Sequence, residues 1–408
     1  MEWKEVTLGE IGTIVGGATP ATKNTSFYDG NIPWLTPKDL SVNGNKYIFR
    51  GERNITEAGF KSCSCKMLPK GSVLFSSRAP IGYVAIAAND MCTNQGFKSV
   101  IPNEETDSEF LYYLLKYNKD NIASQGSGTT FAEVSGKTMK DIEVVVPKEK
   151  EDQHRIASIL SSLDRKIELN NKINADLEEM AQAIFKNWFV DFEPFKDGKF
   201  VDSELGMIPE GWKVVTLDDL TSKFGTGLNP RKNFVLGHGN NYYVTIKNMG
   251  NNRIYLNDRC DKVDDEALAK INKRSKLQKG DLLFSGIGTI GRVAMVVDDP
   301  INWNTSESVF NMHPIDTVSS EFIYLLLLSD KFQQYVQQNA QGGVQQGIRM
   351  ASLKAFQFAI PNDLKLFDNL VKPIISKVKS NDKENDTLSL LRDALLPRLM
   401  SGEIEVPE

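Results

Sequence analysis

The pattern of apolar and polar residues divides the chain into two kinds of segment. In residues 1–147 and 212–361, short runs such as SVLFS and YVAIA are rich in apolar and β-branched residues and are separated by Gly, Pro and Asn. Such runs are typical of strands joined by turns, and the stretch SEFLYYLLK predicts a helix among them. In residues 148–190 and 362–400, apolar residues recur every 3.5 positions instead. That period predicts two long helices that pack as a coiled coil.

The seam positions of the two predicted helices follow one strict 4-3 spacing. In the first helix they are Ile156, Leu160, Leu163, Ile167, Asn170, Asn174, Leu177, Ala181, Ile184 and Trp188. In the second helix each lies 211 residues later, at Phe367, Val371, Ile374, Val378, Asn381, Asn385, Leu388, Arg392, Leu395 and Leu399. At ~1.5 Å per residue, each helix would be about 50 Å long. Pro373 lies early in the second helix, where a proline costs about 3 kcal/mol, so we expect a kink or a late start there.

Four asparagines occupy the middle of these seams: Asn170, Asn174, Asn381 and Asn385. Two helices related by a pseudo-twofold axis would pack antiparallel, with their midpoints facing each other. Amide side chains in an apolar seam cost stability unless they are paired, but they fix the register of the helices. We therefore expect the four asparagines to set the register of the helix pair. The alternative is that they point at water.

The two globular segments are copies of each other. Trp3-Lys-Glu-Val-Thr-Leu8 returns as Trp212-Lys-Val-Val-Thr-Leu217, and Leu68-Pro-Lys-Gly-Ser-Val-Leu-Phe-Ser76 returns as Leu277-Gln-Lys-Gly-Asp-Leu-Leu-Phe-Ser285, both 209 residues later. A repeat of this kind indicates a tandem duplication. We expect an α+β fold in which two pseudo-symmetric β-rich domains are separated by two long antiparallel coiled-coil helices. The segments are 1–147 (domain 1), 148–190 (helix), 191–211 (linker), 212–361 (domain 2), 362–400 (helix) and 401–408 (tail).

Composition narrows the class of protein only slightly. The 408 residues are 40% hydrophobic and 25% charged, with a net charge of −5, which does not by itself indicate a nucleic-acid binder. No apolar run approaches the ~20 residues of a membrane span, and the N-terminus does not look like a secretory signal. The four cysteines are too scattered for a disulfide framework or a metal site. We therefore expect a cytoplasmic protein with no membrane association and no bound metal.

The most conspicuous motif is Gly286-Ile-Gly-Thr-Ile-Gly291, which has the G-x-G-x-x-G spacing of dinucleotide-binding loops. Such a loop must open a helix, whose N-terminal amides hold the phosphates. Here the residues that follow, RVAMVV, are mostly β-branched and apolar, and the first repeat has Ser77-Arg-Ala-Pro-Ile-Gly82 in the same place. We therefore predict a glycine-rich strand–turn–strand and no nucleotide site.

A second motif resembles part of a catalytic site. Asn31-Ile-Pro-Trp34 is similar to the Asn-Pro-Pro-aromatic motif of amino-methyltransferases, but Ile32 replaces the first proline. The second repeat has Asn240-Asn-Tyr-Tyr243 in this place, without proline. No cofactor loop, phosphate loop or carboxylate cluster accompanies either stretch, so we predict no catalytic residues.

Five further stretches resemble one known family. They are Asn31-Ile-Pro-Trp-Leu-Thr-Pro-Lys-Asp-Leu40, Ser76-Ser-Arg-Ala-Pro-Ile-Gly82, Thr93-Asn-Gln-Gly-Phe97, Ala181-Gln-Ala-Ile-Phe-Lys-Asn-Trp-Phe189 and Leu395-Leu-Pro-Arg-Leu-Met-Ser-Gly-Glu-Ile404. Together with two globular units that alternate with two long helices, they resemble the specificity (S) subunits of type I restriction–modification systems. The resemblance covers essentially the whole chain.

The resemblance implies that each globular unit is a target-recognition domain, which reads one half of a bipartite sequence in double-stranded DNA. The helices would set the gap between the halves and dock two modification (methyltransferase) subunits, and restriction subunits would join the complex. The chain itself would be non-catalytic, with S-adenosylmethionine bound by the methyltransferase subunits. The alternatives are an assembly scaffold that binds only proteins, the specificity chain of a fused restriction–modification enzyme, and an enzyme.

Residues that would contact DNA are predicted from their chemistry. Phosphates attract Lys, Arg and small polar donors, whereas base edges favour Arg, Lys, Asn and Gln. The candidates in domain 1 are Lys23, Asn24, Lys38, Arg78, Lys98 and Gln125. The candidates in domain 2 are Arg231, Lys232, Lys247, Arg292, Gln341, Gln345, Gln346 and Arg349. For any one of them the alternative is a solvated surface role.

A stripe beside the first seam is a candidate for partner docking. Leu169, Ile173 and Phe185 lie on this stripe, and we expect them to bury against helices of a partner subunit. The alternative is that they pack against the protein's own domains.

Overall fold

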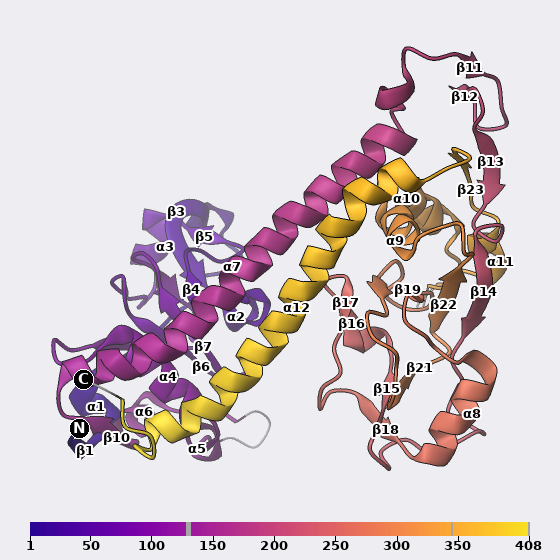
Figure 1. Ribbon diagram of the computed structural model, residues 1–408. Helices are drawn as coiled ribbons and strands as arrows, with labels where there is room; N and C mark the ends of the chain where they lie inside the picture. The colour runs from indigo at the N-terminus through magenta and orange to yellow at the C-terminus, as the bar shows by residue number, and fades with distance from the viewer. Residues whose placement is uncertain (128–131, 344–345, 407–408) are drawn as a thin grey trace. The chain divides into compact units, whose positions relative to one another are not determined.

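The computed structural model describes residues 1–127, 132–343 and 346–406, which form two compact units (Figure 1). Unit 1 contains residues 1–171 and 382–408, and unit 2 contains residues 172–381. Each unit therefore combines one repeated domain with part of each long helix. The compact units do not follow the order of the segments along the chain, because both long helices are divided near their midpoints.

The domain of unit 1 is built on a five-stranded sheet in the order β2-β9-β6-β7-β4. A second sheet has the order β5-β3-β8, and β1 pairs with β10. The strands are β1 (Trp3–Thr7), β2 (Gly12–Gly16), β3 (Tyr28–Leu35), β4 (Tyr47–Ile48), β5 (Asn54–Ile55), β6 (Val73–Ser77), β7 (Ile81–Ala87), β8 (Cys92–Thr93), β9 (Lys98–Pro102) and β10 (Glu143–Pro147). The short helices are α1 (Leu8–Ile11), η1 (Thr25–Phe27), α2 (Pro37–Val42), α3 (Glu57–Lys61), α4 (Ser108–Tyr117), α5 (Lys119–Ser124) and α6 (Gly136–Asp141).

The domain of unit 2 repeats this plan with a four-stranded sheet in the order β14-β22-β19-β20. A second sheet has the order β18-β15-β21. Three separate two-stranded sheets, β13-β23, β11-β12 and β16-β17, complete the domain. The strands are β11 (Phe200–Val201), β12 (Ile208–Pro209), β13 (Lys213–Thr216), β14 (Thr221–Thr226), β15 (Asn241–Val244), β16 (Met249–Gly250), β17 (Arg253–Ile254), β18 (Asp261–Val263), β19 (Leu282–Ser285), β20 (Val293–Met295), β21 (Trp303–Thr305), β22 (Val309–Pro314) and β23 (Gln357–Ile360). The short helices are η2 (Glu193–Phe195), η3 (Ile246–Asn248), α8 (Asp265–Ser275), α9 (Ser320–Leu328), α10 (Asp330–Asn339) and α11 (Met350–Lys354).

The two long helices are α7 (Lys150–Phe189) and α12 (Lys365–Met400). They pack antiparallel in each unit, because partners in α12 have falling numbers as those in α7 rise. The pairs are Asp164 with Arg392 and then Asn170 with Asn385 in unit 1, and Asn174 with Asn381 and then Phe185 with Phe367 in unit 2. Of the two effects expected of Pro373, the late start is wrong, since α12 begins at Lys365 and runs on through the proline, whereas the kink stays a prediction. Val371 and Ile375 are buried on either side of Pro373, and their packing compensates for the lost backbone hydrogen bond.

One apolar helix forms the centre of each domain. In α4 the residues from Phe110 to Leu115 are all buried, and in α9 those from Phe322 to Leu327 are too. A helix that is apolar on every side must be covered all round, and in unit 1 the sheet covers one side while Ile156, Ala157 and Leu160 of α7 cover another. The expected α+β fold, with two repeated β-rich domains and antiparallel long helices, is confirmed. Over the described ranges, no helix is both long and apolar enough to cross a membrane.

Candidate nucleic-acid interface

A tight strand–turn–strand element forms the same structure in both units. β6 and β7 pair antiparallel in unit 1, as β19 and β20 do in unit 2. A serine holds each turn: Ser76 Oγ accepts from the backbone N–H of Tyr83, and Ser285 Oγ accepts from that of Arg292, both at 2.8 Å. The glycine-rich motif is this turn in unit 2, and strand β20 follows it. The prediction of a strand–turn–strand is therefore confirmed.

A polar loop lies over each of these turns. In unit 1 the backbone N–H of Val134 donates to the carbonyl of Ser77 at 3.1 Å. In unit 2 the N–H of Ile348 donates to Gly286 at 2.9 Å, and the N–H of Gly288 donates to Gln346 at 2.8 Å. The turn and the loop are far apart in sequence, yet they form one surface in each unit. We call this surface the turn–loop surface.

Two predicted cations lie together on the turn–loop surface of unit 1. Arg78 Nη1 is 3.3 Å from Glu133 Oε2, and Lys98 Nζ is 3.1 Å from Glu133 Oε1. Sequence reasoning missed Glu133, because no local pattern connects it to Arg78 and Lys98. Partly exposed ion pairs of this kind contribute about 0–1 kcal/mol. A phosphate group could therefore take the place of Glu133 at little cost.

A second loop of each domain is held by a glycine that closely approaches a threonine. A Cβ atom on Gly17 would lie 2.1 Å from the carbonyl oxygen of Thr93, and one on Gly227 would lie 1.7 Å from that of Thr305. Any side chain at these positions would collide with the backbone, so only glycine fits. The loops that follow carry four of the predicted residues, namely Lys23, Asn24, Arg231 and Lys232, all of which are exposed. The side chain of Asn24 also caps η1, accepting from the N–H of Ser26 at 3.1 Å.

Lys38 and Lys247 occupy equivalent positions in the first turn of α2 and of η3. Both elements begin with a capping box, formed by Thr36 and Asp39 or by Thr245 and Asn248. Both lysines are exposed, and Lys38 forms a 2.7 Å ion pair with Glu52. An exposed lysine in the same helical turn of both repeats suits a contact that does not depend on sequence, such as one to phosphate.

Arg292 also makes contacts inside its own domain. Its Nη1 donates to the carbonyl oxygens of Ile246 at 2.8 Å and Met249 at 2.5 Å. The guanidinium thus braces η3 and β16 within unit 2, because these two carbonyls are otherwise at the end of a short helix. We therefore expect Arg292 to act within unit 2 rather than on DNA phosphates, and its predicted DNA contact stays untested.

The remaining predicted residues belong to the polar loops. Gln125 is exposed at the end of α5, and Gln341 and Gln346 are exposed in the loop that lies over the glycine-rich turn. Arg349 is exposed at the start of α11. Gln345 lies outside the described residues, as do residues 128–130 of the loop after Gln125.

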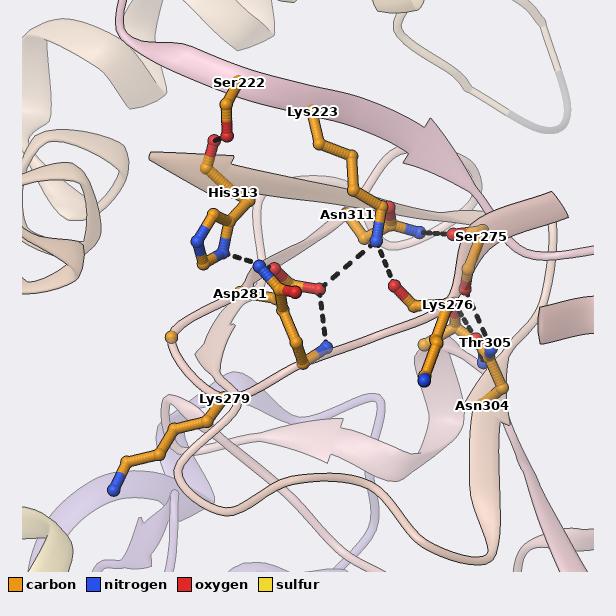
Figure 2. Close-up of polar contacts among 12 residues, drawn as sticks. Ser222, Lys223, Ser275, Lys276, Lys279, Asp281, Asn304, Thr305, Asn311 and His313 are labelled. Atoms are coloured by element: carbon orange, nitrogen blue, oxygen red, sulfur yellow. Dashed lines mark hydrogen bonds and ion pairs between the residues drawn. The ribbon is translucent and has the colours of Figure 1, made fainter. Parts of the chain in front are cut away.

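A polar cluster around the buried carboxylate of Asp281 in unit 2 resembles an acid–base pair (Figure 2). His313 Nδ1 is 2.8 Å from Asp281 Oδ1, and Lys223 Nζ is 3.6 Å from Asp281 Oδ2. Burial raises the pKa of Asp281, although the N–H of Gln278, Lys223 and His313 oppose this. The cluster ties β14 and β22 to the segment before β19. Within the described part of the chain, the imidazole has no nucleophile as a hydrogen-bond partner, and no group of three or more metal-ligating side chains occurs.

The four seam asparagines are buried and hydrogen-bonded. In unit 1, Asn170 Nδ2 donates to Asn385 Oδ1 at 2.9 Å and to Glu384 Oε2 at 2.8 Å. In unit 2, Asn381 Nδ2 donates to Asn174 Oδ1 at 2.8 Å. The alternative that they point at water is excluded by this burial. Their effect on register stays a prediction.

The three predicted docking residues differ in their surroundings. Leu169 is 52% exposed and Ile173 is half-buried, so both are accessible on α7. Phe185 is only 2% exposed, and its ring lies 5.0 Å from that of Phe189 and 5.8 Å from that of Phe322. The docking prediction is therefore wrong for Phe185, which belongs to the core of unit 2.

Similar proteins agree with this picture. Residues 1–179 and 209–383 match the family model described as "Type I restriction modification DNA specificity domain". The chain is 36% identical over 416 residues to the type I restriction enzyme MjaIX specificity subunit of Methanocaldococcus jannaschii, an alignment that covers 100% of this chain and 94% of that one. It is 26% identical to the HindI specificity subunit of Haemophilus influenzae, over 99% of this chain and 100% of the relative.

Its fold is similar to the crystal structure of a type I restriction–modification S subunit from M. genitalium. The TM-score is 0.55 at 17% identity, with 100% of this chain and 97% of that chain covered. The chain belongs to the family of type I restriction–modification specificity subunits.

Proposed function

We propose that this chain is the non-catalytic subunit that gives a type I restriction–modification complex its DNA specificity. Each domain reads one half of a bipartite sequence in double-stranded DNA, and the helix pair sets the gap between the halves. Methyl transfer is the task of partner methyltransferase subunits, which bind S-adenosylmethionine, and restriction subunits complete the assembly.

The observation that carries the proposal is the turn–loop surface, which both units build with the same backbone and different side chains. Unit 1 presents Arg78 of the turn and Lys98 of the adjoining strand β9, whereas unit 2 has Ile287 in place of Arg78 and presents Gln346 in its loop. A shared backbone with divergent donors suits two readers of different half-sites, because base edges are distinguished by the donors and acceptors that meet them.

Exposed apolar residues on the helices support docking of two copies of one partner. Met180 on α7 and Leu391 on α12 lie 211 residues apart in the repeat and are 46% and 47% exposed. Leu169 is exposed in addition. An apolar side chain exposed at the same position of both repeats provides two equivalent contacts for identical subunits. Met180→Glu and Leu391→Glu should each remove one methyltransferase subunit, measured as stoichiometry by native mass spectrometry.

The test of the proposed function is a methylation map. The chain is produced together with the methyltransferase of the same system, and methylated positions in host DNA are determined. We expect a bipartite motif with a fixed gap. Replacing residues 1–147 by another recognition domain should change one half only, and inserting one helical turn near residue 170 should change only the gap.

Two results would contradict the proposal. If the exchange altered both half-sites, the domains would not be independent readers. If the chain assembled with its partners without protecting DNA, and that assembly were insensitive to salt, it would be a protein scaffold, because phosphate contacts make DNA binding fall steeply with salt.

A further inference from the structure

Lys46 is a buried lysine at the edge of the central sheet of unit 1. Its side chain is only 2% exposed, although lysine is almost never fully buried unless it is paired. Lys46 directly precedes β4, the edge strand that pairs in parallel with β7, and its carbonyl accepts from the N–H of Ile86 at 2.9 Å. The backbone of Lys46 is thus part of the sheet, while its side chain leaves the sheet.

The ammonium group of Lys46 reaches two helices. Its Nζ is 2.9 Å from Glu109 Oε1 at the start of α4, and it donates to Ser161 Oγ on α7 at 2.8 Å. Ser161 in turn donates to Glu109. The backbone N–H of Lys46 also donates to Glu168 Oε1 on α7 at 3.1 Å. Sheet edge, recognition-domain helix and spacer helix therefore meet at one residue.

Glu109 is held ionised for this contact. Burial raises its pKa, but hydrogen bonds from Ser161, Tyr47 and Lys46 outweigh burial, so the pKa of Glu109 is lowered. The pair is thus a true ion pair at neutral pH. Tyr47 helps to keep the carboxylate ionised, because its hydroxyl donates to Glu109 Oε1 at 2.5 Å.

The rest of the contact between the domain and α7 combines an apolar core with polar contacts at Gln153, His154 and Asp164 of α7. Ile156, Ala157 and Leu160 pack against α4 in the core of unit 1. Apolar contacts are non-directional, so they hold the domain on the helix without defining its rotation closely. Hydrogen bonds and ion pairs depend on angle and distance, and those of Lys46 link the edge of the central sheet to α7, at Ser161 and Glu168.

We propose that Lys46 is a positioning residue, which fixes the orientation of domain 1 on α7 and so narrows the range of DNA gaps that the complex methylates. This rests on the proposed function. In this proposal Lys46 does not contact the DNA bases. It acts through the orientation of domain 1 on α7.

Unit 2 has a contact at the corresponding sheet edge, built from different chemistry. The β16–β17 hairpin lies against β20, as β4 pairs with β7 in unit 1. Asn252 in its turn donates to Glu178 Oε2 on α7 at 3.2 Å, and its carbonyl accepts from Lys379 on α12 at 3.2 Å. Both repeats therefore attach this edge to the helices, which supports a shared positioning role.

The experiment uses the complex reconstituted with its methyltransferase and the motif found by the methylation map. DNA substrates carry the mapped half-sites with the mapped gap, one base pair fewer or one base pair more. For Lys46→Met, we expect the ratio of methylation at the mapped gap to that at the altered gaps to fall about tenfold. The half-site sequences should not change. Lys46→Arg should restore most of the discrimination, since it returns the charge.

Three control variants separate positioning from stability. Lys148→Met removes an exposed lysine whose ion pair with Glu2 is 2.6 Å long, and should leave the ratio unchanged. Val100→Ala weakens the core of the same domain away from Lys46, and should lower methylation equally at all gaps. If Lys46→Met does not fold, Glu168→Ala removes only the α7 carboxylate that accepts from the backbone N–H of Lys46, and should lower the ratio by a smaller factor.

The outcomes distinguish the two proposals. A wild-type complex that methylates no gapped motif would overturn the proposed function. A wild-type complex that does, combined with a Lys46→Met or Glu168→Ala complex that keeps the wild-type ratio, would overturn only the role of Lys46.

Discussion

The two units join their domain to the helix pair at the same place with opposite chemistry. In unit 1, Asp164 of α7 accepts from Arg392 of α12 at 2.8 Å and from the hydroxyl of Tyr113 in α4. In unit 2 the equivalent positions are taken by Ile375, Ala181 and Leu325, all almost completely buried. Around them lies an aromatic cluster that includes Phe185, Phe189, Phe322 and Phe367.

The difference shows that the backbone arrangement does not require either chemistry. A buried ion pair loses much of its attraction to the cost of taking charges out of water, and apolar residues of similar size often serve equally well. What the ion pair adds is direction, because each of its bonds favours one geometry. In unit 1 polar contacts therefore fix the domain on the long helices, whereas in unit 2 the packing of aromatic rings holds the domain there.

The largest effect is expected from the aromatic cluster. Phe367→Ala removes a ring that lies 4.8 Å from Phe189 and 5.9 Å from Phe322, and should lower the stability of unit 2 by about 3–5 kcal/mol. Thiol labelling measures this locally: Cys260, buried in unit 2, should react faster, while Cys92, buried in unit 1, should not. Leu366→Ala, at an exposed neighbour on α12, is the matched control. Equal acceleration at both cysteines would show that the units unfold together.

Next comes the ion pair of unit 1. Arg392→Ala leaves the buried carboxylate of Asp164 without its cation, and should cost about 3 kcal/mol, measured by labelling of Cys92. Arg398→Ala breaks an ion pair with Glu403 in which both side chains are more than half exposed, and should cost less than about 1 kcal/mol. A loss at Arg392 no greater than that at Arg398 would mean that water already screens the buried pair.

The comparison can also be tested by giving unit 1 the three residues that unit 2 has at the equivalent positions. The triple variant Asp164→Ile, Arg392→Ala, Tyr113→Leu gives unit 1 the residues of unit 2. We expect its stability to lie within about 1 kcal/mol of the wild type, because no buried charge is left unpaired. If the triple variant were as unstable as Arg392→Ala alone, an unpaired charge would not explain the loss of stability. The residues around Asp164, Arg392 and Tyr113 would then require polar side chains at these positions.

A fall in pH should lower the stability of unit 1 through Glu109 and raise that of unit 2 through Asp281. The pKa of Glu109 in unit 1 is lowered from 4.5, so its contribution is present above pH 4.5 and is lost as the pH falls through the lower folded value. The pKa of Asp281 in unit 2 is raised from 3.8 by burial, so protonation in the folded state removes an unfavourable charge as the pH falls. Urea unfolding followed at Trp34 and at Trp303 should show the difference between pH 6 and pH 3. Glu109→Gln and Asp281→Asn should each abolish the effect in their own unit.

The smallest effect is expected on DNA binding by single cations. Arg78→Ala should weaken binding and reduce the salt slope by about 1, as expected for one lost phosphate contact. Arg292→Ala should leave the slope unchanged, since its guanidinium braces backbone carbonyls in unit 2. Glu133→Gln should strengthen binding, because it frees Arg78 and Lys98. A reduced slope for Arg292→Ala would return that residue to the interface.

The sequence by itself determined the features that depend on local period and on repetition. The 4-3 spacing was enough to predict both long helices, since a 3.5-residue period places every seam residue on one side of a helix. Comparison of the two repeats sufficed to recognise the glycine-rich motif as a turn, because the first repeat lacks two of its glycines. It also placed the seam asparagines, although not which of them pair.

Only the tertiary structure decided which polar residues are free and which are committed to partners. Glu133 pairs with two predicted cations, Arg292 turns inward, Phe185 enters the core, and Lys46 becomes the joint between a sheet edge and two helices. Cys63, Cys65 and Cys92 lie in one small cluster despite their spacing in the chain. Each of these depends on contacts between segments that are remote in sequence, whereas periodicity reports only which side of its own helix or strand a residue occupies.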